Sequence, residues 1–350
     1  MVPYADAKLL RIICEWGNWI FPFDDLFDNG DVCEDFTHAE KVMRRMEESF
    51  CEGDGDRQDH TLLHEGENFK RLFELARMHG GIYKSIAEHC SPGQSDARYT
   101  RHTKHVLVVI CEIDYGTGIQ HRYVASMRQY SSGTLAQVRQ AQTTRMGTFE
   151  EVLAQRRQSV CVTPLFVLVE FGHKIDLLDV AFENANVRRV EVLGVEIALL
   201  HNDLLSYCKE EEEGVMHNTV AVCRLQGMSA QDAVTFVGTE VSCRMTEFEE
   251  AVRKLRESKH RRTNELMRYV QGIRDVIKAN LWWSLRTERF LSEQQKLRLM
   301  TEGTLEVASI MPCCHRFTAH PPSNVVASTE SNEGFQKALS FAKEVETHAA

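Results

Sequence analysis

The sequence lacks the marks of several large protein classes. No apolar run reaches the roughly 18 residues of a membrane-spanning helix, and no signal-peptide pattern is present. Eleven cysteines include no Cys-x-x-Cys pair, which indicates reduced thiols in a cytoplasmic protein rather than a disulfide framework. The adjacent residues Cys313, Cys314 and His315 are poorly spaced to chelate a metal. A net charge of −10 argues against a nucleic-acid partner.

Proline is scarce, and low-complexity sequence is absent. Seven prolines and no obvious linker in 350 residues favour one large domain over two. Three of the seven prolines follow Phe290, in a stretch that is rich in serine and threonine. We therefore predict a single domain over residues 1–317 and a partly disordered tail over residues 318–350.

Apolar residues recur at helical spacing along most of the chain, and this pattern predicts an all-α protein. The predicted helices are the one that ends at Asn29-Gly30 and those over 68–90, 164–172, 219–225, 230–255 and 263–285. The stretch 101–121 is an exception, because residues 106–111 form a run rich in β-branched side chains and two glycines follow it. We interpret 101–121 as an insertion that loops out of the helical domain.

Three oxygen-bearing side chains share one predicted helix face. Asn202, Ser206 and Glu210 are spaced i, i+4, i+8, so they lie along one line of an α-helix. An amide, a hydroxyl and a carboxylate form a hard-oxygen ligand set that suits Mg²⁺ better than zinc or copper. Taken alone, the triplet fits a solvated helix face equally well.

A second group of oxygen ligands follows an aromatic run near the start of the chain. Asp24 and Asp28 are one helical turn apart, and Asp25 lies between them. Three carboxylates directly after the aromatic run 19–23 make a poor solvated surface. They predict a metal site at the mouth of an apolar pocket.

These segments together resemble the class I terpene synthases, and the fungal sesquiterpene synthases most of all. Segment 24–28, Asp-Asp-Leu-Phe-Asp, is similar to the aspartate-rich motif of that family. Segment 202–210 is similar to its second metal motif, and Arg289-Phe290 to its late Arg-Tyr pair, with Phe in place of Tyr. The resemblance implies an all-α helical bundle around a central apolar cavity. It also implies that one or two helices that usually precede the aspartate motif are missing, because that motif lies so close to Met1.

The resemblance assigns roles to individual residues. It implies three Mg²⁺ ions held by Asp24, Asp28, Asn202, Ser206 and Glu210. Arg156, 46 residues before Asn202, is similar to the arginine that senses the diphosphate, and Arg157 is the fallback. Lys209 and Arg289 would help to neutralise the diphosphate. The expected substrate-binding residues are Arg156, Lys209, Arg289, Phe290, Phe21 and Trp282; Trp282 and Arg289 are seven residues apart and are predicted to share a helix face.

The implied activity is Mg²⁺-dependent ionisation of farnesyl diphosphate and cyclisation of the carbocation to a sesquiterpene, with release of diphosphate, by a monomer or homodimer. Aromatic faces from Trp16, Trp19, Phe21, Phe23 or Trp282 would stabilise the cation. Two alternatives remain. A chain-elongating prenyltransferase would carry a second Asp-Asp-x-x-Asp, where this chain has the Asn/Ser/Glu form. A truncated, catalytically inactive homologue is the other alternative, because the expected first helices are missing and the insertion is present.

Overall fold

The structure is a computed structural model that describes residues 1–50, 67–90, 118–143, 147–175, 177–258 and 263–302. These residues form helices and connecting turns, and none of them belongs to a strand. The helices are α1 (Ala7–Asp28), α2 (Phe36–Glu48), α3 (Glu67–His89), α4 (Gly118–Ala141), α5 (Phe149–Ser159), α6 (Thr163–His173), α7 (Asp179–Phe182), α8 (Ala185–Glu213), α9 (Thr219–Leu225), α10 (Ala230–Glu257), α11 (Thr263–Arg286) and α12 (Glu293–Thr301). The all-α class predicted from the sequence is confirmed.

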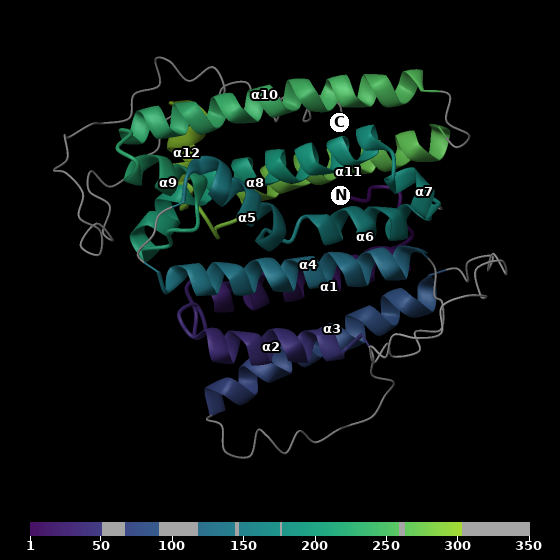
Figure 1. Ribbon diagram of the computed structural model, residues 1–350, viewed down its shortest axis with the longest axis horizontal. Helices are drawn as coiled ribbons and strands as arrows, with labels where there is room; N and C mark the ends of the chain where they lie inside the picture. Colours follow the sequence, from purple (N-terminus) through teal and green to yellow (C-terminus); the bar gives the residue numbers. More distant parts are fainter. Residues whose placement is uncertain (51–66, 91–117, 144–146, 176, 259–262, 303–350) are drawn as a thin grey trace, which may run out of the picture.

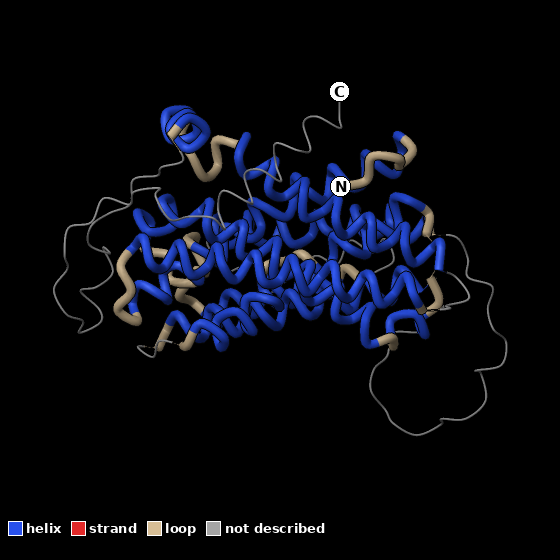
Figure 2. Tube along the Cα trace, turned by 90° about the horizontal axis from the view of Figure 1, so that it is seen from above, coloured by secondary structure: helices blue, strands red, loops and turns tan. Residues whose placement is uncertain are grey.

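The helices are stacked in layers (Figure 1). The helix α10 covers one side and packs against α8, which also packs against α11. The middle of the bundle holds α4 and α6, which pack against each other, and α1. The helices α2 and α3 cover the opposite side, where α3 packs against α1. Seen from above in Figure 2, most of the long helices run along the long axis of the molecule.

The first helix forms because its apolar side chains follow the helical period. Asp6 caps its start by accepting hydrogen bonds from two backbone N–H groups of the first turn. Its buried residues recur every three or four positions and are Leu9, Ile12, Ile13, Trp16, Trp19, Ile20, Phe23 and Phe27. This stripe packs α1 into the bundle and leaves Asp24, Asp25 and Asp28 beside it, where they are partly buried.

The helices α8 and α11 run parallel to each other. The Tyr269 hydroxyl donates to Glu191 Oε1 at 2.6 Å, and further along both helices Asn280 Nδ2 donates to the Ala198 carbonyl at 3.0 Å. Because the residue numbers of the bonded partners rise together along both helices, their C-terminal ends lie at the same end of the bundle. The residues that follow α11 are thereby brought toward the C-terminal half of α8.

The boundaries of the predicted helices agree closely with the structure. The predicted segments 68–90, 164–172, 230–255 and 263–285 correspond to α3, α6, α10 and α11, and 219–225 is α9 itself. Of the expected insertion 101–121, only 118–121 are described, and they form the first turn of α4. The remainder of that segment and the predicted tail 318–350 lie outside the described residues.

Two further expectations concern membrane spans and cysteines. Among the helices of the described residues, none is long and apolar enough to cross a bilayer. Within the same residues, free thiols are present at Cys14, Cys33, Cys161, Cys223 and Cys243. The central apolar cavity implied by the family resemblance stays a prediction.

Candidate active site at the ends of α1 and α8

The two outer aspartates of α1 are each held by a donor from α4. The Tyr130 hydroxyl donates to Asp24 Oδ1 at 2.7 Å, and Gln137 Nε2 donates to Asp28 Oδ1 at 2.7 Å. Burial raises the pKa of Asp24 well above its usual range, and the neighbouring Asp28 charge raises it further. Burial also raises the pKa of Asp28. The negative charges of both carboxylates are therefore poorly compensated by positive groups nearby.

The middle aspartate has a different partner. Arg289, in the turn between α11 and α12, donates Nη1 to Asp25 Oδ2 at 2.8 Å and Nη2 to Asp25 Oδ1. Its Nε is buried and has no hydrogen-bond partner among the described residues. Despite burial, which opposes its charge, the pKa of Arg289 is raised, first by Asp25 and then by Asp24 and Asp28. The structure therefore brings Arg289 to the aspartate motif.

An aromatic group surrounds this arginine. Phe21 stacks on Trp283 with ring centroids 4.4 Å apart and planes 14° apart, and Phe290 meets Trp283 edge-on at 5.7 Å. The Arg289 guanidinium carbon lies 5.2 Å from the Phe21 centroid and 5.7 Å from that of Phe290. Phe21, Trp283, Phe290 and Arg289 thus form one cluster, which we call the aromatic–arginine cluster.

The predicted helical relationship between Trp282 and Arg289 is wrong. The helix α11 ends at Arg286, so a seven-residue spacing no longer places both side chains on one face. Trp282 instead lies under Arg286, whose guanidinium carbon is 4.2 Å from its ring centroid. Sequence reasoning missed Trp283 because the spacing rule favoured its neighbour. A role of Trp282 in substrate binding stays a prediction.

Other aromatic residues proposed as cation stabilisers are buried on α1, and Trp19 faces α3. Trp19 Nε1 donates to the Leu75 carbonyl at 2.8 Å, and its ring lies 4.7 Å from that of His79. Trp16 and Phe23 are also fully buried. These three side chains belong to the packed core of the described residues, whereas Phe21 and Trp283 are each 36% exposed.

The second line of oxygen ligands lies on α8. The Ser206 side chain is fully buried, and its hydroxyl has no hydrogen-bond partner among the described residues. Glu210 accepts a hydrogen bond from Asn218 Nδ2 at 2.9 Å. Burial raises the pKa of Glu210 to about 7, although Arg156 opposes the shift. Asn202 lies on the same face and is half-buried.

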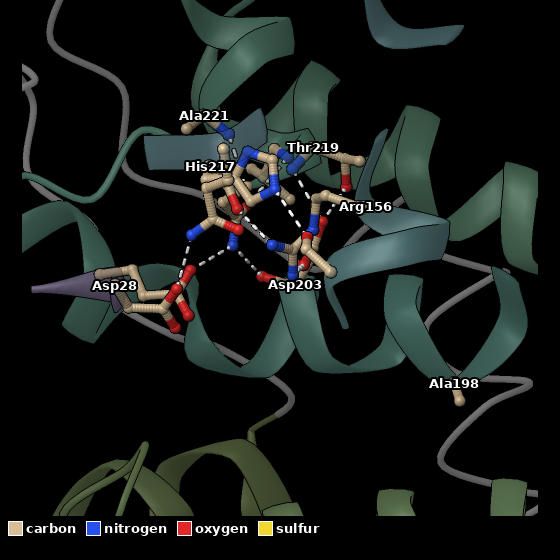
Figure 3. Close-up of polar contacts among 12 residues, drawn as sticks. Asp28, Arg156, Ala198, Asp203, His217, Thr219 and Ala221 are labelled. Carbon is tan, nitrogen blue, oxygen red and sulfur yellow. Dashed lines mark hydrogen bonds and ion pairs between the residues drawn. The ribbon is translucent and has the colours of Figure 1, made fainter. Parts of the chain in front are cut away.

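Arg156 forms a buried ion pair with Asp203, a residue that sequence reasoning missed (Figure 3). Its Nη2 donates to Asp203 Oδ1, and its Nη1 donates to the His217 carbonyl at 2.5 Å. The other Asp203 oxygen accepts from the backbone N–H and the hydroxyl of Thr219, at 2.8 and 2.7 Å. Asp203 is off the Asn202 face by about 100° of helix rotation, so the motif spacing gave no reason to select it.

The charge of Arg156 interacts with predicted metal ligands on both α1 and α8. Burial opposes its charge, but Asp203, Glu210 and Asp28 raise its pKa, in that order of strength. Two of these carboxylates belong to the predicted metal ligands, one on each helix. Arg157 points elsewhere, because its Nη1 lies 3.2 Å from Glu196 Oε1. The structure thus separates the two candidates for the diphosphate sensor and places Arg156 at the site.

The ends of α1 and α8 meet directly. Asn29, which follows α1, donates Nδ2 to Glu213 Oε2 at 2.7 Å. Lys209 Nζ lies 3.5 Å from the other oxygen of Glu213. Lys209 is therefore at the junction of the two helices, one residue before Glu210.

The residues present fit divalent ions. All the predicted ligands offer oxygen, Ser206 has an unused buried hydroxyl, and Asp24, Asp28 and Glu210 have raised pKa values that a cation would reverse. The described residues contain no group of three or more His, Cys, Asp or Glu side chains that could hold a metal unaided. Any ion here would need Asn202, Ser206 and ligands from outside the protein.

Comparison with known proteins identifies the family. The model of terpene synthase family 2, C-terminal metal binding, matches residues 15–247. The chain belongs to the terpene synthase family. It is 31% identical over 293 residues to silphinene synthase of Penicillium patulum, covering 84% of this chain and 70% of that protein. It is 27% identical over 321 residues to (+)-eremophilene synthase of Gibberella fujikuroi, covering 89% and 78%.

A solved structure supports the fold. The crystal structure of α-eudesmol synthase superposes with a TM-score of 0.60 at 18% identity, covering 82% of this chain and 82% of that one. At this identity the likeness shows the fold alone. Together with the family match, it confirms the class I terpene synthase fold that the resemblance implied. The metal-binding family description agrees with the oxygen ligands on α1 and α8.

Proposed function

We propose that this terpene synthase ionises farnesyl diphosphate with the help of three Mg²⁺ ions and cyclises the resulting carbocation to a sesquiterpene. The observation that carries the proposal is the junction of the two ligand helices. Asn29 bonds to Glu213 where α1 and α8 meet, and Arg156 interacts with both Asp28 and Glu210. A diphosphate at this junction would reach both lines of oxygen ligands and the arginine.

Five residues are proposed to hold the ions, namely Asp24 and Asp28 on α1 and Asn202, Ser206 and Glu210 on α8. When bound, Mg²⁺ supplies the positive charge that makes diphosphate a good leaving group. The raised pKa values of the three carboxylates support this assignment, because such groups are stabilised as anions by a nearby cation.

The cationic side chains contribute charge and orientation. Arg156, Lys209 and Arg289 come from α5, α8 and the turn after α11, so they approach the junction from three different elements. Fixed positive groups are most effective where negative charge grows during bond breaking. The leaving diphosphate gains charge as the carbon–oxygen bond lengthens, and these residues are proposed to bind it more strongly at that point.

The aromatic–arginine cluster is proposed to face the hydrocarbon part of the substrate. The faces of Phe21, Trp283 and Phe290 carry partial negative charge and would attract a carbocation by about 2 kcal/mol when water is excluded. The partial exposure of Phe21 and Trp283 leaves their surfaces accessible to a ligand. Exclusion of water at the same place would decide between a hydrocarbon and an alcohol product.

The proposal is tested by incubating the purified chain with Mg²⁺ and, separately, with geranyl, farnesyl or geranylgeranyl diphosphate. Volatile products are analysed by gas chromatography and mass spectrometry, and released diphosphate is measured in parallel. We expect a cyclic fifteen-carbon hydrocarbon or alcohol from farnesyl diphosphate, and none when a chelator is present. An Asp24→Asn protein serves as the inactive control.

Two other outcomes would overturn the proposed activity, and a third would change its substrate. Longer diphosphates formed after addition of isopentenyl diphosphate would indicate chain elongation. A folded protein that releases no diphosphate from any of the three substrates would support the inactive homologue. Cyclic products from geranylgeranyl diphosphate alone would support terpene synthase activity, with geranylgeranyl diphosphate instead of farnesyl diphosphate as the substrate.

A further inference from the structure

One face of α4 contacts the outer aspartates of α1 and also the helix α5, which carries Arg156. Tyr130, Gly133 and Gln137 are spaced i, i+3, i+7, so they lie along a single stripe of the helix. All three are buried. The stripe carries no recognisable motif, and its residues belong to none of the segments that resemble the family's motifs.

Tyr130 and Gln137 reach the outer aspartates of α1 in the same manner. Each donates one hydrogen bond of 2.7 Å, and each uses the Oδ1 oxygen of its aspartate. Such a bond fixes the rotation of the carboxylate and leaves its Oδ2 oxygen to another ligand. Without these donors, two adjacent carboxylates that repel each other would turn apart.

Gly133 lies between these two donors and meets α5. A Cβ at position 133 would lie 2.6 Å from the backbone carbon of Gln158 and 2.7 Å from the nitrogen of Ser159. Only glycine allows this approach of the two backbones. Because Arg156 is in the same turn of α5, the stripe also fixes α4 against the helix that carries the proposed diphosphate sensor.

We propose that Tyr130 and Gln137 are positioning residues that orient Asp24 and Asp28 for divalent metal ions. The proposal rests on the proposed function, since it requires these aspartates to be metal ligands. The two residues hold the carboxylates through Oδ1 and present Oδ2 to the ion. Donors that orient metal ligands in this way typically change metal affinity by about 10- to 100-fold when they are removed.

The test measures metal binding directly. Binding of Mn²⁺ is followed by electron paramagnetic resonance in the presence of inorganic diphosphate, for the native chain, Tyr130→Phe and Gln137→Met. Both variants keep the size of the side chain and remove the donor. We expect Mn²⁺ to bind about 10- to 100-fold more weakly to each variant, with the native helix content by circular dichroism.

Two matched control variants are available in the same chain. Tyr269→Phe removes a buried hydroxyl that donates to Glu191, about 16 Å along α8 from Asn202 at 1.5 Å per residue. Gln120→Met removes a side-chain amide that donates to the Ala87 carbonyl at 3.0 Å. Both controls should bind Mn²⁺ as the native chain does.

A third variant separates orientation from packing. Gln137→Glu keeps the shape of glutamine but replaces the donor by a carboxylate, which repels Asp28. If position 137 only fills space, Gln137→Met should bind Mn²⁺ as the native chain does, and any change in Gln137→Glu then reports the added charge alone. The two Gln137 variants carry the test if Tyr130→Phe does not fold.

The outcomes distinguish this inference from the proposed function. If the native chain binds no Mn²⁺ with diphosphate, the metal site itself is wrong. If the native chain binds Mn²⁺ and the Tyr130 and Gln137 variants bind it within twofold of the controls, the positioning role is rejected and the metal site stands.

Discussion

Arg156 on α5 and Asp203 on α8 form an ion pair in which the arginine side chain is 9% exposed and the aspartate is completely buried. Asp203 is the residue next to Asn202, so the pair joins the proposed diphosphate sensor to the proposed metal helix. Thr219 donates two hydrogen bonds to the second carboxylate oxygen of Asp203. This buried ion pair therefore fixes the position of Arg156, the proposed diphosphate sensor, relative to the proposed metal ligands on α8.

Asp203→Ala should destabilise the chain strongly. Removal of one partner leaves the buried guanidinium of Arg156 without its counter-ion, and such a change costs about 3–5 kcal/mol of unfolding free energy. The control is Glu247→Ala, which breaks an ion pair with Arg189 whose side chains are 48% and 53% exposed and should cost about 1 kcal/mol or less. Urea denaturation of both variants measures the difference, and equal losses would show that the burial of Asp203 has no energetic consequence.

Arg156→Lys and Arg157→Lys should separate the two neighbouring arginines. Lysine keeps the charge at position 156 but loses the forked donors that reach Asp203 and the His217 carbonyl. We expect Arg156→Lys to lower kcat by roughly 10²-fold, and Arg157→Lys to leave kcat within a few-fold because Arg157 faces Glu196. Steady-state release of diphosphate is the measurement. A large loss in Arg157→Lys alone would move the sensor by one residue.

Asp24→Asn and Asn202→Ala should each abolish turnover without unfolding the protein. For Asp24 we further expect a higher melting temperature in the absence of metal, because the neutral amide avoids the burial of a charge whose pKa is already raised. The control is Asp179→Asn, which makes the same substitution at a side chain that is 77% exposed. It should leave turnover unchanged. Near-native turnover of Asp24→Asn at limiting Mg²⁺ would falsify the ligand assignment.

Glu170 should make the stability depend on pH. Burial raises its pKa to about 7 even though Arg122 lowers it. The folded state therefore holds this proton more tightly than the unfolded state, and its stabilising effect is present below about pH 4.5 and is lost as pH rises through 7. Between pH 5 and pH 8 the native chain should lose about 2 kcal/mol more unfolding free energy than Glu170→Gln. Parallel slopes for the two proteins in urea titrations would contradict this.

Gly272→Ala should destabilise the contact between α6 and α11. A Cβ at this position would lie 2.1 Å from Val169 Cγ1, and overpacking of a core contact costs about 1–3 kcal/mol. Gly81→Ala is the matched control, since nothing lies within 4 Å of its Cβ position. Alanine there should stabilise α3 by about 0.5–1 kcal/mol. Thermal unfolding should thus shift in opposite directions for the two variants.

The sequence predicted those features that depend on local spacing. The apolar stripe of α1 and the line Asn202, Ser206, Glu210 both follow from the helical period. Tyr130 could not be found in this way, because its partner Asp24 is 106 residues away in the chain. The seven-residue spacing favours Trp282 over Trp283 only if the helix continues past Arg286, where α11 ends. Long-range partners and helix ends are set by tertiary packing, which a single sequence does not display.

The pairing of Arg289 with Asp25 has a consequence for synthesis of the chain. The two residues are separated by 264 positions, so a ribosome that adds about 5–20 residues per second leaves the aspartate motif without this partner for on the order of ten to fifty seconds. During that interval the aspartates of α1 can contact only helices that have already emerged. Translation speed between α1 and α11 is therefore a variable that should affect the yield of correctly assembled protein.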